Sequence, residues 1–241
     1  MKVSLFPTLR DLGRGSLQGG VVVVIDVLRF TSTVIAALEA GAKEIIPVRD
    51  VETASKLAGS APRREKLLAG ERKGKPIEGF DLFNSPLEFE PERVSGATII
   101  MSTSNGSRAV VEASRASRVL IGAINNISAV AREIEDLDHV SILCSGFDGG
   151  IAIEDLYCGG LLIEILGGRI AYDDLGDTGL MALLLARSAG SDIEKLLRLS
   201  RRGKELVAAG YEKDVIFCSK KDMSVAVPEM KRGALRLGSR A

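Results

Sequence analysis

Short apolar runs recur along the chain, each followed by a polar loop and then by an amphipathic segment. The clearest run is Val21 to Ile25, five branched apolar residues that end at Asp26. Branched residues without polar alternation are typical of a strand buried on both faces. Four similar runs stand at residues 45–48, 98–101, 119–121 and 141–144. The five runs predict strands, and the polar residue after each run predicts where its strand ends.

Each run leads into a segment with helical periodicity. We expect helices near residues 32–40, 52–58, 109–115, 127–135 and 153–166. This alternation predicts a three-layer α/β/α fold with a mostly parallel sheet, in which some strands could be antiparallel. Ligands of such folds bind at the carboxyl ends of the strands, so we expect the site there.

Two regions interrupt this rhythm. Residues 70–93 hold three prolines and three glycines and show little periodicity. A loop of this length is usually functional or disordered, and its apolar Phe80, Leu82 and Phe83 favour order. Helical patterns at 180–189 and 191–210 precede a VAVP segment at 225–228. We expect one domain over residues 1–241, with a helix-rich C-terminal lobe from about residue 169 that returns to a last strand.

The composition is that of a folded globular protein, because 46% of the 241 residues are apolar. Lys plus Arg and Asp plus Glu are equal at 32 each, and there is no Trp. The chain therefore lacks the charge and the stacking platforms of a nucleic-acid binder. No apolar run approaches a membrane span or a signal-peptide core, so we expect a cytoplasmic protein without a membrane partner. Abundant Ala, Leu and Val on the later helices leave room for a homodimer face.

Histidine and cysteine limit the chemistry further. His139 is the only histidine, and its place at the start of an apolar run predicts a surface or strand-edge position. Zinc sites and phosphatase mechanisms that need two histidines are excluded. Any divalent metal would be held mainly by oxygen, which favours Mg²⁺. Cys144, Cys158 and Cys218 are odd in number and widely spaced, so we expect buried free thiols.

The segment after the first strand combines an acid with anion-binding groups. Asp26 is followed by Arg29 and by the hydroxyls of residues 31–33, which offer N-caps for the next helix. This combination indicates metal-assisted chemistry on a phosphate. Leu28 stands where aspartyl-phosphate enzymes have a second acid, which favours water over Asp26 as the nucleophile. The chain also lacks a Walker loop, a GxGxxG fingerprint and an arginine six places after Cys144.

A row of polar residues follows the strand at 98–101. Its members are Ser102, Thr103, Ser104, Asn105, Gly106, Ser107 and Arg108. Backbone N–H groups, hydroxyls and a guanidinium in this order can surround an anion at a helix start. The alternative interpretation is simple helix capping, which accounts for one or two hydroxyls.

Six acids lie on the loops that we expect to meet: Asp26, Glu71, Asp81, Asp148, Glu154 and Asp155. Mg²⁺ takes one or two carboxylates and completes its shell with water and substrate oxygens. Asp26 is the first candidate, followed by Glu71 and Asp81, which stand next to glycines in the aperiodic loop. Glu154 and Asp155 fit equally well as first-turn acids that interact with their own helix dipole.

Five motifs in order resemble the 2-phosphosulfolactate phosphatase family, the Mg²⁺-dependent acid phosphatases of coenzyme M biosynthesis. They read DVLRFTST, AGER, GFDLFNSPLE, MSTSNGSRA and GFDGGIAIEDLYCGG. Serine replaces threonine at several hydroxyl positions, and Phe30 is bulkier than the small residue typical of the family. The resemblance implies hydrolysis of (R)-2-phospho-3-sulfolactate to 3-sulfolactate and phosphate, a small substrate with three anionic groups.

The resemblance and the residues together assign roles. The predicted catalytic residues are Asp26, Arg29, Asn105 and Arg108. The predicted substrate-binding residues are Arg72, Asn84, Ser85, Ser102, Thr103, Ser104, Gly106 and Ser107. The predicted Mg²⁺ ligands are Asp26, Glu71 and Asp81. Three alternatives stay open: a module that binds an anionic metabolite without turning it over, a lyase or phosphotransferase, and a phosphatase of another phosphorylated hydroxy acid.

Overall fold

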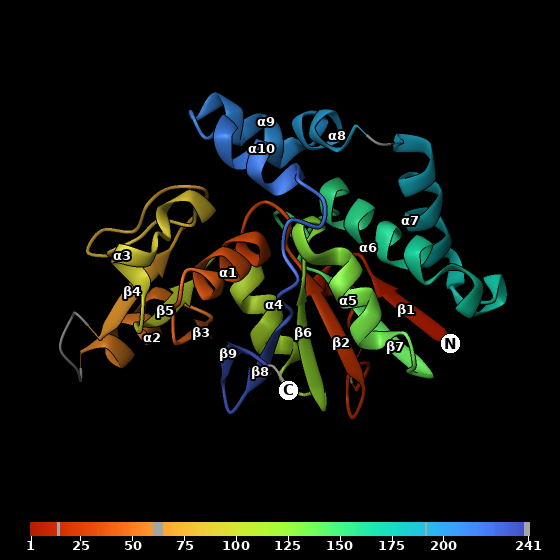
Figure 1. Cartoon of the computed structure of the whole chain (residues 1–241), viewed down its shortest axis with the longest axis horizontal. Coiled ribbons are helices and arrows are strands. Elements are labelled where there is room, and N and C mark those ends of the chain that lie inside the picture. The colour runs from red at the N-terminus through yellow and green to blue at the C-terminus, as the bar shows by residue number, and fades with distance from the viewer. Residues whose placement is uncertain (14, 60–64, 191, 239–241) are drawn as a thin grey trace.

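The computed structural model describes residues 1–13, 15–59, 65–190 and 192–238. The described residues form one nine-stranded sheet with helices on both faces (Figure 1). The strands are β1 (Lys2–Phe6), β2 (Val21–Ile25), β3 (Glu44–Val48), β4 (Lys66–Gly70), β5 (Thr98–Ser102), β6 (Arg118–Gly122), β7 (His139–Cys144), β8 (Pro228–Lys231) and β9 (Ala234–Leu237). The longer helices are α1 (Phe30–Glu39), α2 (Val51–Ala58), α4 (Gly106–Ala113), α5 (Ile127–Ile134), α6 (Ile153–Leu166) and α7 (Gly176–Ala189). The short α3 (Pro91–Val94) precedes β5, and the C-terminal lobe contains α8 (Ile193–Leu199), α9 (Arg201–Ala208) and α10 (Glu212–Ser219).

The sheet consists of two parallel sets joined by an antiparallel hairpin. Its strand order is β1-β7-β2-β6-β8-β9-β3-β5-β4. The hairpin of β8 and β9 pairs with β6 at Leu120 and Glu229, and with β3 at Ile45 and Leu235. The prediction of a mostly parallel sheet with room for antiparallel strands is therefore confirmed.

Strand β2 shows why the sheet is covered on both sides. Val23 and Ile25 belong to a core cluster with apolar residues of α5, α6 and α7, whereas Val22 and Val24 pack with α1 and α4. All four side chains are fully buried, as the run of branched residues predicts. A smaller cluster around Ile100 fixes α2 to the other parallel set. The molecule thus has the predicted three layers.

The five predicted strands and the helices after them are confirmed, with shifts of a few residues. Three strands have no counterpart in the prediction: β1, β4 and the second strand of the hairpin. β1 and β4 lie at the two edges of the sheet: Ser4 interrupts the apolar pattern of β1, and the short run KLLAG of β4 leads straight into the aperiodic region. The pattern at 191–210 forms two helices, because the sequence turns at Ser200, whose hydroxyl caps α9 by accepting from the N–H of Gly203. Ser191 lies outside the described residues.

The aperiodic region is ordered and packs against the sheet. Leu82 and Phe83 are buried, and the N–H of Gly70 donates to the carbonyl of Leu82 at 3.1 Å. The C-terminal lobe lies at the top of Figure 1, and Leu197, Leu206 and Val215 belong to the same core cluster as β2. Among the described helices, none has the length and apolar character needed to cross a membrane.

The histidine and cysteine predictions are confirmed. His139 is exposed at the first position of β7, where its ring contacts the Ser4 hydroxyl at 3.1 Å. Cys144, Cys158 and Cys218 are buried free thiols. Burial raises the pKa of Cys144 well above its usual range, so this thiol stays protonated and is a poor nucleophile.

Candidate active site

A cavity of about 780 Å³ lies where the loops after β2, β4, β5 and β7 meet the C-terminal lobe. The two parallel sets do not share one straight edge, because the antiparallel hairpin reverses β3 relative to β6. Loops from the carboxyl ends of both sets nevertheless meet around this cavity. Its charged residues are Arg10, Asp26, Glu71, Arg72, Lys73, Arg108, Asp148, Glu154, Asp155, Arg202 and Glu205.

Asp26 stands at the end of β2 and lines the cavity with only 8% of its surface exposed. Burial and the nearby carboxylate of Glu71 raise the pKa of Asp26 from 3.8 to about 6. A hydrogen bond with Ser145 and the positive charge of Arg202 oppose this rise. The ionised form of Asp26 is thus disfavoured in the cavity, and a cation bound beside it would stabilise that form.

The start of α4 lies directly against Asp26. A Cβ atom placed on Gly106 would be 2.4 Å from Asp26 Oδ2 and 2.5 Å from the Cβ of Phe30. Glycine is therefore required for this approach between the β5–α4 loop and the end of β2. Phe30 itself is fully buried in the core and does not line the cavity, so its bulk does not alter the cavity walls.

Two of the three hydroxyls after Asp26 hold the loop, and that of Thr33 is buried without a hydrogen-bond partner within the residues that the structure describes. The prediction that they cap the helix is wrong, because Arg29 is the N-cap of α1 and no side chain bonds there. Thr31 Oγ1 donates to the carbonyl of Asp26 at 2.8 Å, and Ser32 Oγ donates to the carbonyl of Val27 at 3.2 Å. Residues 31–33 are fully buried and do not line the cavity. These bonds tie the first turn of α1 to the end of β2 and so fix the position of Asp26.

Asp155, in the first turn of α6, joins two strand ends. Its Oδ1 accepts from the N–H of Val27 at 2.8 Å, and its Oδ2 accepts from Ser145 Oγ at 3.1 Å and from the N–H of Gly146 at 3.2 Å. Burial and the charges of Asp26 and Glu154 raise the pKa of Asp155 well above its usual range. Asp155 therefore ties the exits of β2 and β7 together.

Glu154 is the second buried acid of α6 and lines the cavity with 3% of its surface exposed. Burial raises its pKa to about 7, and the charge of Asp26 adds to the rise. Its own backbone N–H and the Ser200 hydroxyl oppose this shift by hydrogen bonding. The bond to its own N–H agrees with the first-turn interpretation, and its place in the cavity agrees with the functional one.

Glu71 connects the loops after β4 and β5. Its carboxylate accepts from the N–H of Ser104 at 2.6 Å, from Ser104 Oγ at 3.2 Å and from the N–H of Gly74 at 2.8 Å. Glu71 is 4% exposed. Because these three donors already occupy it, its clearest role is to hold the two loops next to Asp26.

The polar row at residues 102–108 divides into structural and cavity-lining residues. Thr103 and Ser107 cap each other's backbone, since each side-chain oxygen accepts from the other residue's N–H, at 2.9 and 2.8 Å. Ser102 is fully buried, and its Oγ accepts from Arg72 at 2.5 Å. Ser104, Asn105 and Arg108 line the cavity. Capping thus accounts for part of the row. Asn105 and Arg108 remain available to a ligand, whereas the Ser104 hydroxyl already donates to Glu71.

Arg72 lines the cavity next to this row. Its guanidinium donates to the carbonyl of Glu71 at 2.8 Å and to Ser102. Arg108 Nε donates to the carbonyl of Arg49 at 3.2 Å. Both guanidinium groups therefore keep free donors on a framework of backbone carbonyls, as anion-binding arginines need.

Arg29 lies outside the cavity. It is 1% exposed, forms a buried ion pair with Asp214 of α10, and stacks on the rings of Phe83 and Tyr211 at 4.4 and 4.8 Å. Ser85 Oγ donates to the other oxygen of Asp214 at 2.8 Å. The structure therefore places Arg29 and Ser85, both predicted to contact substrate, in a junction that fastens the C-terminal lobe.

Asp81 also lies outside the cavity. Its Oδ2 accepts from the N–H of Leu68 at 2.9 Å, so it satisfies a backbone donor on the edge strand β4. Asn84 lies three residues further on and lines the cavity with 3% of its surface exposed. Its amide oxygen is buried without a hydrogen-bond partner in the described part of the chain. That oxygen is free to accept from a substrate or to bind a cation.

The sequence reasoning missed three cationic residues of the cavity: Arg10, Lys73 and Arg202. The Arg10 guanidinium packs on the backbone at Gly149, where a Cβ would be 2.4 Å from its Cζ. Arg202 belongs to a helix whose charged positions resemble an ordinary solvent-facing surface. No local pattern distinguishes these residues, because their position depends on contacts between distant segments.

The charge balance of the cavity bears on metal binding. Four buried carboxyl groups line it, those of Asp26, Glu71, Glu154 and Asp155, whereas Arg202 is the one buried cation among its described residues. Within the described ranges, no group of three or more His, Cys, Asp or Glu side chains is arranged to hold a metal ion alone. Mg²⁺ needs only one or two carboxylates, so this all-oxygen donor set fits it.

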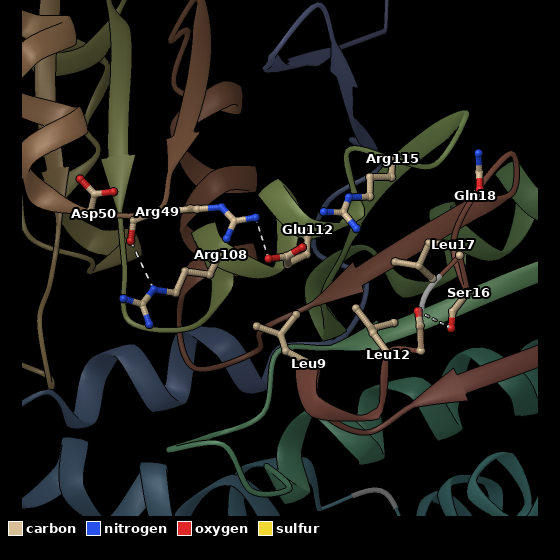
Figure 2. Close-up of a pocket in the computed structure, with 12 residues that line it drawn as sticks. Leu9, Leu12, Ser16, Leu17, Gln18, Arg49, Asp50, Arg108, Glu112 and Arg115 are labelled. Carbon is tan, nitrogen blue, oxygen red and sulfur yellow. Dashed lines mark hydrogen bonds and ion pairs between the residues drawn. The ribbon is translucent and has the colours of Figure 1, made fainter.

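A second cleft of about 750 Å³ adjoins the cavity and shares Leu9 and Arg108 with it (Figure 2). Arg49 forms an ion pair with Glu112 at 2.6 Å across this cleft, and Leu12 and Leu17 form an apolar wall. The buried carboxyl groups described above line only the first cavity, which is therefore the candidate active site.

Comparison with known proteins gives a family model and several curated relatives that span nearly the whole chain. The chain matches the model of the 2-phosphosulpholactate phosphatase family over residues 8–233. It is 36% identical over 237 residues to a protein of Caldanaerobacter subterraneus subsp. tengcongensis, with 98% of each chain covered. It is 39% identical over 222 residues to one of Symbiobacterium thermophilum, covering 92% of this chain and 95% of that one. A protein of Clostridium acetobutylicum is 35% identical over 236 residues, with coverages of 98% and 100%. All three are named probable 2-phosphosulfolactate phosphatase.

Proposed function

Because this chain belongs to the 2-phosphosulfolactate phosphatase family, we propose that it hydrolyses (R)-2-phospho-3-sulfolactate to 3-sulfolactate and inorganic phosphate with the help of Mg²⁺. It is a phosphoric monoester hydrolase. The observation that carries the proposal is one cavity in which buried Asp26 lies with Ser104, Asn105 and Arg108. The reaction would give the chain a place in coenzyme M biosynthesis.

The charged groups of the cavity suit such a substrate. Phosphate, carboxylate and sulfonate on three carbons need several cations and N–H donors, and they need them close together. Arg10, Arg72, Lys73 and Arg108 line the cavity. Guanidinium groups bind the planar and tetrahedral oxygen arrays of such anions through paired hydrogen bonds.

The Mg²⁺ ion would be held by Asp26 first, with Glu154 and the free amide oxygen of Asn84 nearby. We do not propose Asp81 as a Mg²⁺ ligand, because it lies outside the cavity. We do not propose Glu71 either, because its carboxylate already accepts three hydrogen bonds. When bound, Mg²⁺ supplies a Lewis acid that withdraws charge from phosphoryl oxygens.

The protein residues orient the phosphoryl group for attack. Asn105 makes no capping bond to α4, so its amide is free to donate to a phosphoryl oxygen. Arg108 binds the other oxygens and stabilises the charge that builds up in the transition state. The oxygen of a water molecule bonds to phosphorus while the bond between phosphorus and the C2 oxygen breaks. Water gives up one proton and the C2 oxygen takes up one, so the products are the alcohol and inorganic phosphate. We assign the attack to water and not to Asp26, because Leu28 stands where aspartyl-phosphate enzymes have a second acid.

The test is phosphate release from (R)-2-phospho-3-sulfolactate and from other phosphorylated hydroxy acids, with added Mg²⁺ and with EDTA. We expect release that depends on Mg²⁺, and a fall in kcat of about 1,000-fold or more in Asp26→Asn. The matched control is Asp81→Asn, which keeps a carbonyl oxygen for Leu68 and should retain activity. Circular dichroism checks that both variants fold.

Each other outcome points to a different function. Binding of the esters without phosphate release would mean a binding module. Transfer of the phosphoryl group to an added acceptor would mean a phosphotransferase, and an unsaturated product would mean a lyase. Preference for another phosphorylated hydroxy acid would change the substrate and keep the reaction. A phosphoenzyme trapped by acid quench would make a carboxylate the nucleophile in place of water.

A further inference from the structure

Arg202 is a buried cation of the cavity without a function so far. It stands in the first turn of α9, in the C-terminal lobe, and is 8% exposed. Its side chain lines the same cavity as Asp26, although the two residues are far apart in the sequence. The lobe thus contributes directly to a site that the sheet otherwise builds.

The guanidinium of Arg202 has few partners. Among the described residues, the one carboxylate within ion-pair distance is that of Glu205, at 3.4 Å. The ring of Phe147 lies 5.6 Å from its Cζ. Arginine carries five N–H donors, so the guanidinium can bind a ligand of the cavity while it keeps its contact with Glu205. A cation in this place on the cavity wall favours an anionic ligand.

The position of Arg202 specifies which part of a ligand it would meet. A Cβ on Gly74 would be 2.8 Å from Arg202 Nη1, so the guanidinium lies against the loop after β4. From there its charge acts on both Asp26 and Glu154. These two carboxyl groups are the ones proposed to hold Mg²⁺, which would attract the phosphoryl group of a substrate to this part of the cavity.

We propose that Arg202 is a catalytic residue that binds the oxygens of the phosphoryl group of the substrate. This inference rests on the proposed function, whose centre is Asp26. It assigns the phosphoryl end of the substrate to Arg202, Asn105 and Arg108, and leaves Arg10, Arg72 and Lys73 for the carboxylate and sulfonate. The C-terminal lobe then has to be docked for the reaction to proceed.

The neighbouring Arg201 offers a matched control. Its side chain is 68% exposed and pairs with Asp148 at 2.9 Å and with Glu205 at 3.5 Å. Both arginines belong to the first turn of the same helix, so their substitutions change the charge and the helix propensity of α9 equally. Only Arg202 presents its donors inside the cavity.

The experiment compares Arg202→Gln, Arg202→Lys and Arg201→Gln with the wild type. Steady-state kinetics with the phosphorylated substrate should show a fall in kcat of about 100-fold in Arg202→Gln, as for loss of one donor to a transition-state oxygen. Arg202→Lys should fall less, because it keeps the charge and loses the forked geometry. Arg201→Gln should match the wild type.

Two product-binding measurements, made by calorimetry in the presence of Mg²⁺, separate this role from others. Arg202→Gln should weaken the binding of inorganic phosphate at least tenfold and leave that of 3-sulfolactate unchanged. Weaker binding of 3-sulfolactate alone would overturn the assignment, as would unchanged kcat and phosphate affinity in a folded Arg202→Gln. A wild-type protein that binds phosphate and hydrolyses no ester would contradict the proposed function, while the phosphate titration would still test Arg202.

Discussion

Asp26 is positioned by backbone atoms of its own loop and of a distant segment. The N–H of Phe30 hydrogen-bonds to it, and the start of α4 at Gly106 packs against both residues. This leaves one face of the carboxylate open to the cavity. A glycine between polar residues usually indicates a flexible loop. Gly106 instead allows the start of α4 to contact the end of β2.

Gly106→Ala tests this contact. A methyl group 2.4 Å from Asp26 Oδ2 and 2.5 Å from Phe30 must displace one of them. We expect a loss of about 1–3 kcal/mol in the free energy of unfolding, together with a large drop in kcat. Urea denaturation and phosphate release measure the two effects. The control is Gly168→Ala, since a Cβ there has no atom within 4 Å. Equal behaviour of both variants would contradict the contact.

The sequence predicts the place of a side chain well when that place depends on neighbouring residues in the chain. Asp26 could be predicted because a buried strand must end where polar residues begin. The location of Arg29 could not, because its partner Asp214 is 185 residues away. For the same reason a polar row could not be divided in advance into capping residues, such as Thr103, and cavity residues, such as Asn105.

The junction of Arg29, Asp214 and Ser85 shows how elements are fastened together. It joins the loop after β2, the aperiodic region and α10, all with buried polar groups. Since Arg29 is fully enclosed, loss of its charge partner leaves a buried cation without compensation.

Asp214→Asn should therefore lower the free energy of unfolding by about 3 kcal/mol. The urea midpoint measures this loss. The control on the same helix is Glu212→Gln, whose side chain is 55% exposed and pairs with Arg198 on the surface. Glu212→Gln should shift the midpoint far less, because water screens its charge. A larger effect from Glu212→Gln would mean that the surface pair, and not the buried one, fastens the lobe.

The β8–β9 hairpin is the element that joins the two parallel sets. Leu235 is fully buried beside Ile45, whereas Leu237 of the same strand is 39% exposed. Leu235→Ala should cost about 2–5 kcal/mol of unfolding free energy, and Leu237→Ala well under half of that. Chemical denaturation of both variants gives the comparison. Similar losses would show that the hairpin adds no core packing.

Element types were predictable because periodicity reports burial, and both faces of the central strands are buried. The order of the strands was not. Sequence patterns identify a last strand near the end of the chain without showing that a hairpin enters the middle of the sheet. Edge strand β1 was missed because its pattern is mixed, and edge strand β4 was missed because its short apolar run leads straight into the aperiodic region.

For the molecule as a whole, the acidic cavity links stability to pH. The folded state raises the pKa of Asp26 to about 6 and that of Glu154 to about 7, above 3.8 and 4.5. Between these values the folded state holds more protons than the unfolded state, so stability falls as pH rises. For each group, a tenfold difference in proton affinity between the two states corresponds to about 1.4 kcal/mol of stability.

We therefore expect these groups to lower the Tm between pH 5.5 and pH 8 in EDTA. Added Mg²⁺ should restore part of the loss, with a larger gain at pH 8, because it binds the ionised carboxylates. Thermal denaturation monitored by circular dichroism measures both. Asp26→Asn should flatten the pH dependence. A Tm that rises with pH in EDTA and is equal with and without Mg²⁺ would contradict this account.

Residues 228–237 are synthesised after every other strand of the sheet, yet they occupy its centre. While the ribosome is still translating, β6 and β3 are both exposed edges with unpaired backbone groups. The nascent polypeptide cannot complete its sheet until this hairpin has left the exit tunnel. A ribosome that stalls near codon 225 would release a product with two open edges, suited to self-association or to capture by chaperones.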